Sequence, residues 1–200
     1  MYAKATISNR IEAFCREAGP SIFFAALTAL GARIAIRLPF SPVPVTLQVL
    51  VVLMSGLALG SRRGFIAQLG YLTAGMLGAP VFAGGTGGPA VFLGPTGGYL
   101  MAFPVAAWVA GRLGEALRIQ GLGLLAAALA ALAVIYGGGG LWLTIWLQAT
   151  QLGSFETALV GAWHLGVRPF ILVDLVKAFL ATAAVGGSQT LWRKWLEPEL

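Results

Sequence analysis

The sequence has very few charged residues for its length. Only 10% of its 200 residues are charged and 58% are hydrophobic, whereas about 25% of the residues in an ordinary soluble domain are charged. A soluble fold of this length cannot hide so much apolar surface, and exposing it to water costs about 25 cal/mol for each Å². The shortage of charge therefore predicts a membrane protein whose apolar surface faces lipid.

Cysteine and histidine are almost absent. The single cysteine, Cys15, excludes an internal disulfide bond, and the single histidine, His164, leaves no Cys/His cluster to hold a metal ion. The chain also lacks a GxSxG elbow, an HExxH motif and a phosphate-binding GK[ST] loop. We therefore expect no enzyme activity, no ATP hydrolysis by this chain, no metal and no cofactor.

Acidic residues are the scarcer kind of charge, and the formal net charge is +6. The basic residues are scattered between apolar stretches and form no stripe or aromatic-interleaved patch, so we expect no nucleic-acid partner. The arrangement of the chain in the membrane explains these basic residues better than nucleic-acid binding does.

Six apolar stretches divide the chain, at about 20–38, 45–60, 64–78, 96–111, 121–146 and 169–191. They predict an all-α polytopic membrane protein with one domain over 1–200 and six transmembrane helices within about 20–192. Residues 1–19 contain five charges and no apolar core, which indicates a cytoplasmic leader rather than a signal peptide. The second and third stretches fall short of the ~20 residues of a straight span, so we expect short, extended or protein-covered helices there.

Alternating the six spans places most basic residues on one membrane face. Only Arg37 and Arg168 lie in the opposite connections, and Arg33 and Lys177 lie within spans. The positive-inside rule then predicts that both termini are cytoplasmic and that the outer connections lie at about 39–44, 79–95 and 147–168. The basic residues of the predicted inner face are Lys4, Arg10, Arg16, Arg62, Arg63, Arg112, Arg118, Arg193 and Lys194.

Two glycine-rich segments break the apolar pattern. The predicted loop at 79–95 has no charge and combines Gly and Pro with Val, Phe and Leu. Irregular backbone at membrane depth is tolerated only inside protein or beside a cavity, so this loop is expected to be a lid or a cavity lining; the alternative is a connector that dips into the membrane interface. The glycines at 137–140 predict a break, a kink or a close backbone contact.

Two ionisable residues, Asp174 and Lys177, lie within the last apolar stretch. Each costs roughly 2.5 to 3.5 kcal/mol near mid-membrane on insertion scales, so the pair needs a reason to be there. Their spacing of three puts them on one helix face, about 9 Å from the predicted outer end. They are expected to form either a solute-binding pair open to the outside or an ion pair that fixes helix packing.

Small residues four apart, Ala25 and Ala29, lie in the first apolar stretch. This spacing lets another helix approach closely. The partner is either a helix of the same chain or a partner subunit.

Four motifs together resemble a known family. They are PVPVTLQ at 42–48, PVFAGG at 80–85, LGPTGGYL at 93–100 and GVRPF at 166–170, followed by Asp174 and Lys177. In this order they look like the BioY family, the substrate-binding S components of energy-coupling factor (ECF) biotin transporters. The resemblance implies a six-helix domain that captures biotin outside the bacterial cytoplasmic membrane. It also implies a transmembrane coupling protein and two ATPase subunits as partners, or a homo-oligomer that works without them.

The resemblance further implies that Asp174 and Lys177 bind biotin and that the first two outer loops close the site. Asp174 would accept from a ureido N–H and Lys177 would donate to the ureido carbonyl. The chain departs from the family at Val173, where glycine is usual. The full expected site comprises Asp174, Lys177, Arg37 for the biotin carboxylate, Gln48, Thr86, Tyr99, Gly85, and Val45 and Phe82 as apolar cover. Ala25 and Ala29 become expected docking residues.

Three alternatives remain open at this point. An S component for another vitamin keeps the class and changes the solute. An ion-coupled secondary transporter would use Asp174 as its proton carrier, although the absence of a convincing internal repeat disfavours it. A purely structural membrane protein would bind no saturable ligand.

Overall fold

The computed structural model describes residues 2–117, 122–151 and 153–196, and the side chains of 18–116, 122–150 and 153–187. Outside this part of the chain lie Cys15 and six of the basic side chains assigned to the inner face, namely Lys4, Arg10, Arg16, Arg118, Arg193 and Lys194.

The prediction of an all-α chain is confirmed. The helices are α1 (Tyr2–Arg33), α2 (Gln48–Leu59), α3 (Ser61–Met76), α4 (Gly97–Leu117), α5 (Leu122–Gln151), α6 (Phe155–Ala162) and α7 (Ile171–Leu196). Three short turns of helix join them: the 3₁₀ segments η1 (Ala83–Gly85) and η2 (Pro89–Leu93), and the π-helical η3 (Trp163–Val167). A small antiparallel hairpin is formed by β1 (Ala35–Ile36) and β2 (Val45–Thr46).

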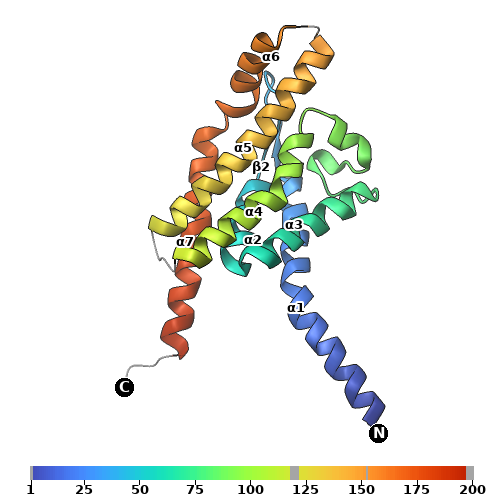
Figure 1. Ribbon diagram of the computed structural model, residues 1–200, viewed down its shortest axis with the longest axis vertical. Coiled ribbons are helices and arrows are strands. Elements are labelled where there is room, and N and C mark those ends of the chain that lie inside the picture. Colours follow the sequence, from blue (N-terminus) through green and yellow to red (C-terminus); the bar gives the residue numbers. More distant parts are fainter. Residues whose placement is uncertain (1, 118–121, 152, 197–200) are drawn as a thin grey trace.

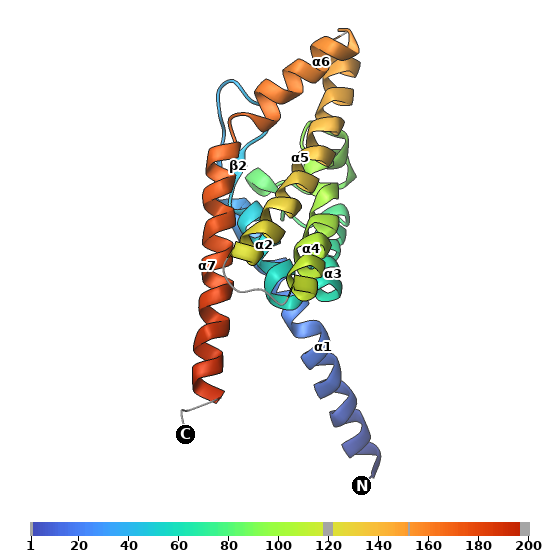
Figure 2. The same cartoon turned by 60° about the vertical axis from the view of Figure 1, so that its left-hand side comes forward.

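The helices form an elongated bundle (Figures 1 and 2). Helix α4 packs against α2, α3 and α5, and α7 packs against α2 and α5. The ends of α1 and α7 that lead to the two termini lie at the same end of the molecule, and α6 lies at the opposite end. The bundle therefore has a terminal end and an α6 end.

Length and composition identify few complete spans among the described residues. Helix Leu122–Thr150 is long and apolar enough to cross a membrane alone, and Phe155–Val167 with Ile171–Gly187 forms a second candidate that is bent by 47°. Helices α2 and α3 have only 12 and 16 residues, as the short apolar stretches predicted. The count of six spans remains a prediction.

Some helix bounds differ from those of the apolar stretches. The predicted leader, residues 1–19, is largely helical and continuous with the first apolar stretch, because α1 runs from Tyr2 through Pro20; a helix can continue past a single proline at the cost of one backbone hydrogen bond. It ends at Arg33, where the chain turns into the hairpin. The last helix extends to Leu196.

The predicted third outer connection, 147–168, is mostly helical. Helix α5 continues to Gln151. Ser154 then caps α6 by accepting a hydrogen bond from the backbone N–H of Thr157 at 3.2 Å, which satisfies an orphan donor of the first turn.

The predicted tight inner connection is a turn at Gly60, whose φ of +82° suits glycine. Helix α3 begins immediately after it, and Glu115 of α4 caps this helix start. The Glu115 carboxylate accepts from the Ser61 backbone N–H at 2.8 Å and from the Ser61 hydroxyl at 3.0 Å. A carboxylate at a helix N-terminus is favoured by the helix dipole.

The glycines at 137–140 do not break α5, which is continuous through them. The close contact that was the other expectation is confirmed. A Cβ atom on Gly139 would lie 2.2 Å from the Tyr99 ring, and one on Gly138 would lie 3.1 Å from the Ala102 Cβ. These glycines therefore let α4 and α5 approach, as small residues do in membrane helix pairs.

The loop at 79–95 folds back onto the bundle around two buried aromatic rings, Phe82 and Phe92. The two rings meet edge to face with centroids 5.5 Å apart. Phe82 also packs against α3, where a Cβ on Gly75 would lie 2.1 Å from the ring. The two rings belong to the hydrophobic core of the bundle, so the loop is packed onto the helices.

Candidate ligand-binding site

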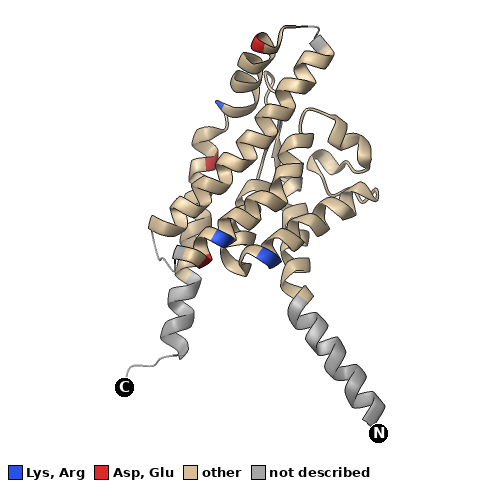
Figure 3. Ribbon diagram, viewed as in Figure 1, with Lys and Arg blue, Asp and Glu red and all other residues tan. Residues whose placement is uncertain are grey.

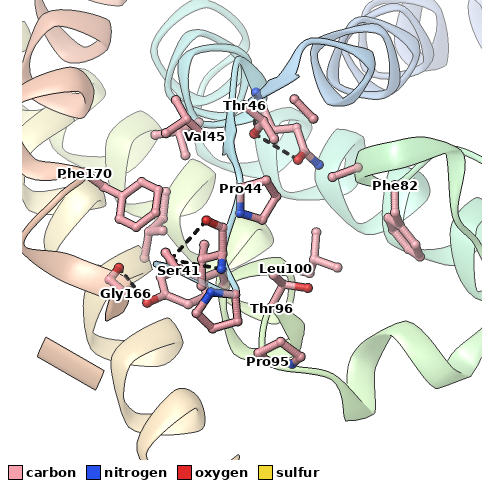
Figure 4. Close-up of a pocket in the computed structure, with 18 of the residues that line it drawn as sticks. Ser41, Pro44, Val45, Thr46, Phe82, Pro95, Thr96, Leu100, Gly166 and Phe170 are labelled. Carbon is pink, nitrogen blue, oxygen red and sulfur yellow. Dashed lines mark hydrogen bonds between the residues drawn. The ribbon is translucent and has the colours of Figure 1, made fainter. Parts of the chain in front are cut away.

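A cavity of about 420 Å³ opens between the hairpin loop, the loop at 79–95 and helices α4, α5 and α7. This volume lies in the usual range for small-molecule sites, roughly 300–1,000 Å³. Figure 4 shows Pro44 and Val45 of the hairpin between Phe170 on one side and Phe82 on the other. The loop at 79–95 contributes Phe82 and Thr86, which confirms the expectation of a cavity lining.

Eight of the nine predicted site residues line this cavity: Asp174, Lys177, Arg37, Gln48, Thr86, Tyr99, Val45 and Phe82. Gly85 is not among the described residues that line it, although its neighbours Gly84 and Thr86 are. Gly85 has a φ of +73°, and a Cβ there would lie 3.1 Å from the Arg33 guanidinium. Its place is explained by backbone geometry, and a ligand contact by it remains only a prediction.

Asp174 and Lys177 form a buried ion pair on the cavity wall. The Lys177 Nζ lies 2.6 Å from the Asp174 Oδ1, and the residues are only 5% and 4% exposed. The Tyr136 hydroxyl of α5 donates to the other carboxylate oxygen, Oδ2, at 2.7 Å. Tyr136 was missed by sequence reasoning, because a lone tyrosine in an apolar stretch carries no spacing signal towards a residue 38 positions away.

Tyr99 lies in a slot made by two glycines. Its ring packs on Gly139, and its hydroxyl donates to the Gly166 carbonyl at 2.7 Å. A Cβ on Gly166 would lie 2.3 Å from that hydroxyl. Gly166 belongs to the π-helical turn η3, and π-helical segments are frequent at functional sites. The slot explains why the GVRPF and LGPTGGYL motifs come together in space.

Gln48 connects the cavity wall to the loop at 79–95. Its Oε1 accepts from the Thr46 hydroxyl at 3.0 Å, and its Nε2 donates to the Tyr71 hydroxyl. Tyr71, which sequence reasoning also missed, donates in turn to the Val81 carbonyl at 3.2 Å. Tyr71 is 1% exposed and packs edge to face on Phe82. This chain of three hydrogen bonds connects Thr46 through Gln48 and Tyr71 to Val81 of the loop at 79–95.

Two arginines lie where the hairpin meets the loop at 79–95. The Arg33 guanidinium donates to the Pro80 carbonyl at 2.8 Å. Arg37 lines the cavity and is exposed, with its Nη2 3.0 Å from where a Cβ on Gly84 would lie. Arg37 thus places a fully charged donor group at the cavity mouth.

The loop at 39–44 is joined by a hydrogen bond to η3 beside the cavity. The Ser41 hydroxyl donates to the Leu165 carbonyl of η3 and accepts from the Val43 backbone N–H at 3.1 Å. Residues of both predicted outer loops, 39–44 and 79–95, therefore line the cavity.

Ala25 and Ala29 line a separate groove of about 680 Å³ between α1 and α3. The α3 wall of this groove includes three small residues. They are Ala67, Gly70 and Ala74, and the other α3 residues that line it are Arg62, Arg63, Ile66 and Tyr71. Both alanines are half-buried. The small-residue face of α1 is thus incompletely filled by the chain's own helices.

Sequence and structure comparisons agree on one family. Residues 6–194 match the model of the BioY family. The chain is 45% identical over 162 residues to the probable biotin transporter BioY of Pyrococcus horikoshii, covering 81% of this chain and 88% of the relative. It is 38% identical over 158 residues to the biotin transporter BioY of Thermotoga maritima, covering 79% and 86%.

A solved structure, the S-component for biotin from an ECF-type ABC transporter, superposes with a TM-score of 0.76 at 28% identity. The match covers 90% of this chain and 93% of that chain. The fold, the sequence motifs and the family model agree over nearly the whole length, so this helical membrane protein with an S-component fold belongs to the BioY family.

Proposed function

We propose that this chain binds biotin in the cavity and acts as the S component of an ECF-type biotin transporter. The observation that carries the proposal is the buried Asp174–Lys177 pair on the wall of a mainly apolar cavity in a chain of the BioY family. Asp174 supplies an acceptor and Lys177 a donor, side by side.

This arrangement suits the chemistry of biotin. Each edge of its cyclic urea presents an N–H beside a carbonyl oxygen, and these complement Asp174 and Lys177. The apolar bicycle fits between Val45, Phe82 and Phe170, which line the same cavity. The exposed Arg37 at the mouth is the proposed partner of the carboxylate on the flexible tail.

The proposed function involves partner subunits. The proposed ATPase subunits and transmembrane coupling protein are supported by the likeness to the S-component of an ECF-type ABC transporter, and they would supply the ATP hydrolysis for which this sequence has no GK[ST] motif. Ala25 and Ala29, in the groove between α1 and α3, are the proposed docking face for a helix of the coupling protein. A homo-oligomer of this chain is the alternative assembly.

Biotin binding and vitamin competition test the function directly. Protein purified in detergent is expected to retain bound biotin and to bind labelled biotin saturably, with unlabelled biotin but not an excess of another vitamin displacing it. If a different vitamin displaced the label and biotin did not, that vitamin would replace biotin as the proposed solute. Uptake that survives ATP depletion and collapses with the proton gradient would favour the ion-coupled alternative.

We also propose that the terminal end of the bundle faces the cytoplasm of a bacterial cell. The basic residues of α3 and α4 lie towards this end (Figure 3). They are Arg62 and Arg63 of α3 and Arg112 of α4. The positive-inside rule assigns such a cluster to the cytoplasm. Cytoplasmic reporters fused to either terminus are expected to be active, and an active periplasmic reporter at the C-terminus would overturn the orientation.

A further inference from the structure

Both oxygens of the Asp174 carboxylate have a partner in the protein. Oδ1 accepts from the Lys177 ammonium at 2.6 Å, and Oδ2 accepts from the Tyr136 hydroxyl at 2.7 Å. Lys177 is on the same helix as Asp174, whereas Tyr136 comes from α5, which packs against α7. All three side chains line the cavity.

Counting hydrogen-bond capacity shows what remains for a ligand. An ionised carboxylate has about four acceptor positions and an ammonium has three donors. Each Asp174 oxygen uses one position in the protein, and Lys177 uses one donor. One acceptor position on each oxygen and further lysine donors stay available to the cavity. A ligand therefore meets an acceptor beside a donor.

The hydroxyl of Tyr136 decides which way the carboxylate faces. The terminal torsion of an aspartate is broad, so Lys177 alone would leave Oδ2 free to swing. Tyr136 is anchored on a different helix and has a rigid ring, and it pins Oδ2 from the α5 side. The pinned carboxylate keeps Oδ1 next to Lys177.

We propose that Tyr136 is a positioning residue that orients Asp174, so that the site selects a ring in which an N–H stands beside a carbonyl. This inference rests on the proposed biotin function and deepens it. Tyr136 acts through Asp174, and its effect depends on the ligand having an N–H that Asp174 can accept.

The test is Tyr136→Phe with two ligands: biotin, and a biotin analogue methylated on its ureido nitrogens. Without the hydroxyl, the carboxylate must be oriented as the ligand binds, so the biotin affinity is expected to fall roughly 10-fold. The analogue cannot donate to Asp174, so its affinity, measured by competition, is expected to change far less. The ratio of the two affinities within one preparation does not depend on the fraction of folded protein. Equal losses for both ligands would overturn the proposal.

A double-mutant cycle with Asp174→Asn gives a second readout. If Tyr136 acts through Asp174, Tyr136→Phe is expected to cost little in the Asp174→Asn background. Tyr71→Phe is the matched control, because it deletes the same kind of hydroxyl but one bonded to Gln48 and Val81. Its effect is expected to add to that of Asp174→Asn.

Full additivity of Tyr136→Phe with Asp174→Asn would show that the hydroxyl acts independently and would overturn the proposal. Failure of the unmodified protein to bind biotin is a distinct result. It would overturn the proposed function, and with it this role of Tyr136.

Discussion

Asp174→Asn is expected to weaken biotin binding by roughly 10- to 150-fold, because a hydrogen bond to a buried charged group contributes about 1.5 to 3 kcal/mol. The amide keeps the shape of the carboxylate but has only one acceptor oxygen. Its NH₂ must face either the Lys177 ammonium or the Tyr136 hydroxyl, both of which donate to Asp174 in the native site. Calorimetry on the purified protein would measure the loss.

Lys177→Met tests the contribution of the other member of the ion pair to biotin binding. Methionine preserves the apolar stem and removes the ammonium, so the affinity is expected to fall by a similar factor. Stability is also expected to fall, because Asp174 is 4% exposed and would keep only Tyr136 as a side-chain partner.

The double variant separates ligand binding from simple packing. If the pair serves only to fix α7 in place, removing both charges together should restore folding and leave biotin affinity near its original value. We expect instead that the double variant folds but binds biotin at least as weakly as either single variant. Near-native affinity in the double variant would refute the binding role.

Ala29→Trp is expected to abolish most biotin uptake while leaving biotin binding by the isolated protein intact. Ala29 lies in the groove between α1 and α3 and does not line the cavity. A bulky ring there would prevent the close approach of a partner helix. Forcing extra bulk into a packed contact costs about 1–3 kcal/mol, which is roughly 5- to 150-fold in affinity.

Leu30→Trp is the matched control for this experiment. Leu30 is the next residue on α1, is 63% exposed and lies outside the groove. A tryptophan there places the same indole ring on a surface suited to lipid, so uptake is expected to change little. If Ala29→Trp destroyed biotin binding as severely as uptake, the alanine face would be internal packing instead.

Much of the site was predictable because its motifs are local in the sequence. The PVPVTLQ motif supplies Val45 and Gln48, and the last apolar stretch supplies Asp174 and Lys177 three residues apart. A charged pair in an apolar helix is conspicuous because membrane insertion makes it costly. Gly85 was included on motif proximity alone, and its position beside Arg33 shows that a conformational glycine can stand next to a lining residue without being one.

Residues that act across the bundle were not predictable in the same way. Tyr136 and Asp174 are 38 positions apart, and Tyr71 reaches Gln48 and Val81 from α3. No spacing rule links such positions, since they meet only when α5 packs on α7 and α3 packs on α2. Helix α6 was also missed, because the eight residues at 155–162 are too few for an apolar pattern to distinguish a short helix from a covered connection.

The sequence by itself determined that this is a membrane protein, because so few charges cannot cover a soluble fold, and it determined which helix carries the charged pair. The tertiary structure alone decided how that pair is used. Side-chain hydrogen bonds form between surfaces that packing brings together, so only the packed bundle reveals that Tyr136 holds Asp174 and that Gly139 makes room for Tyr99. Local composition determines which segments are suited to the membrane, whereas the contacts between segments determine which ligand groups the cavity can bind.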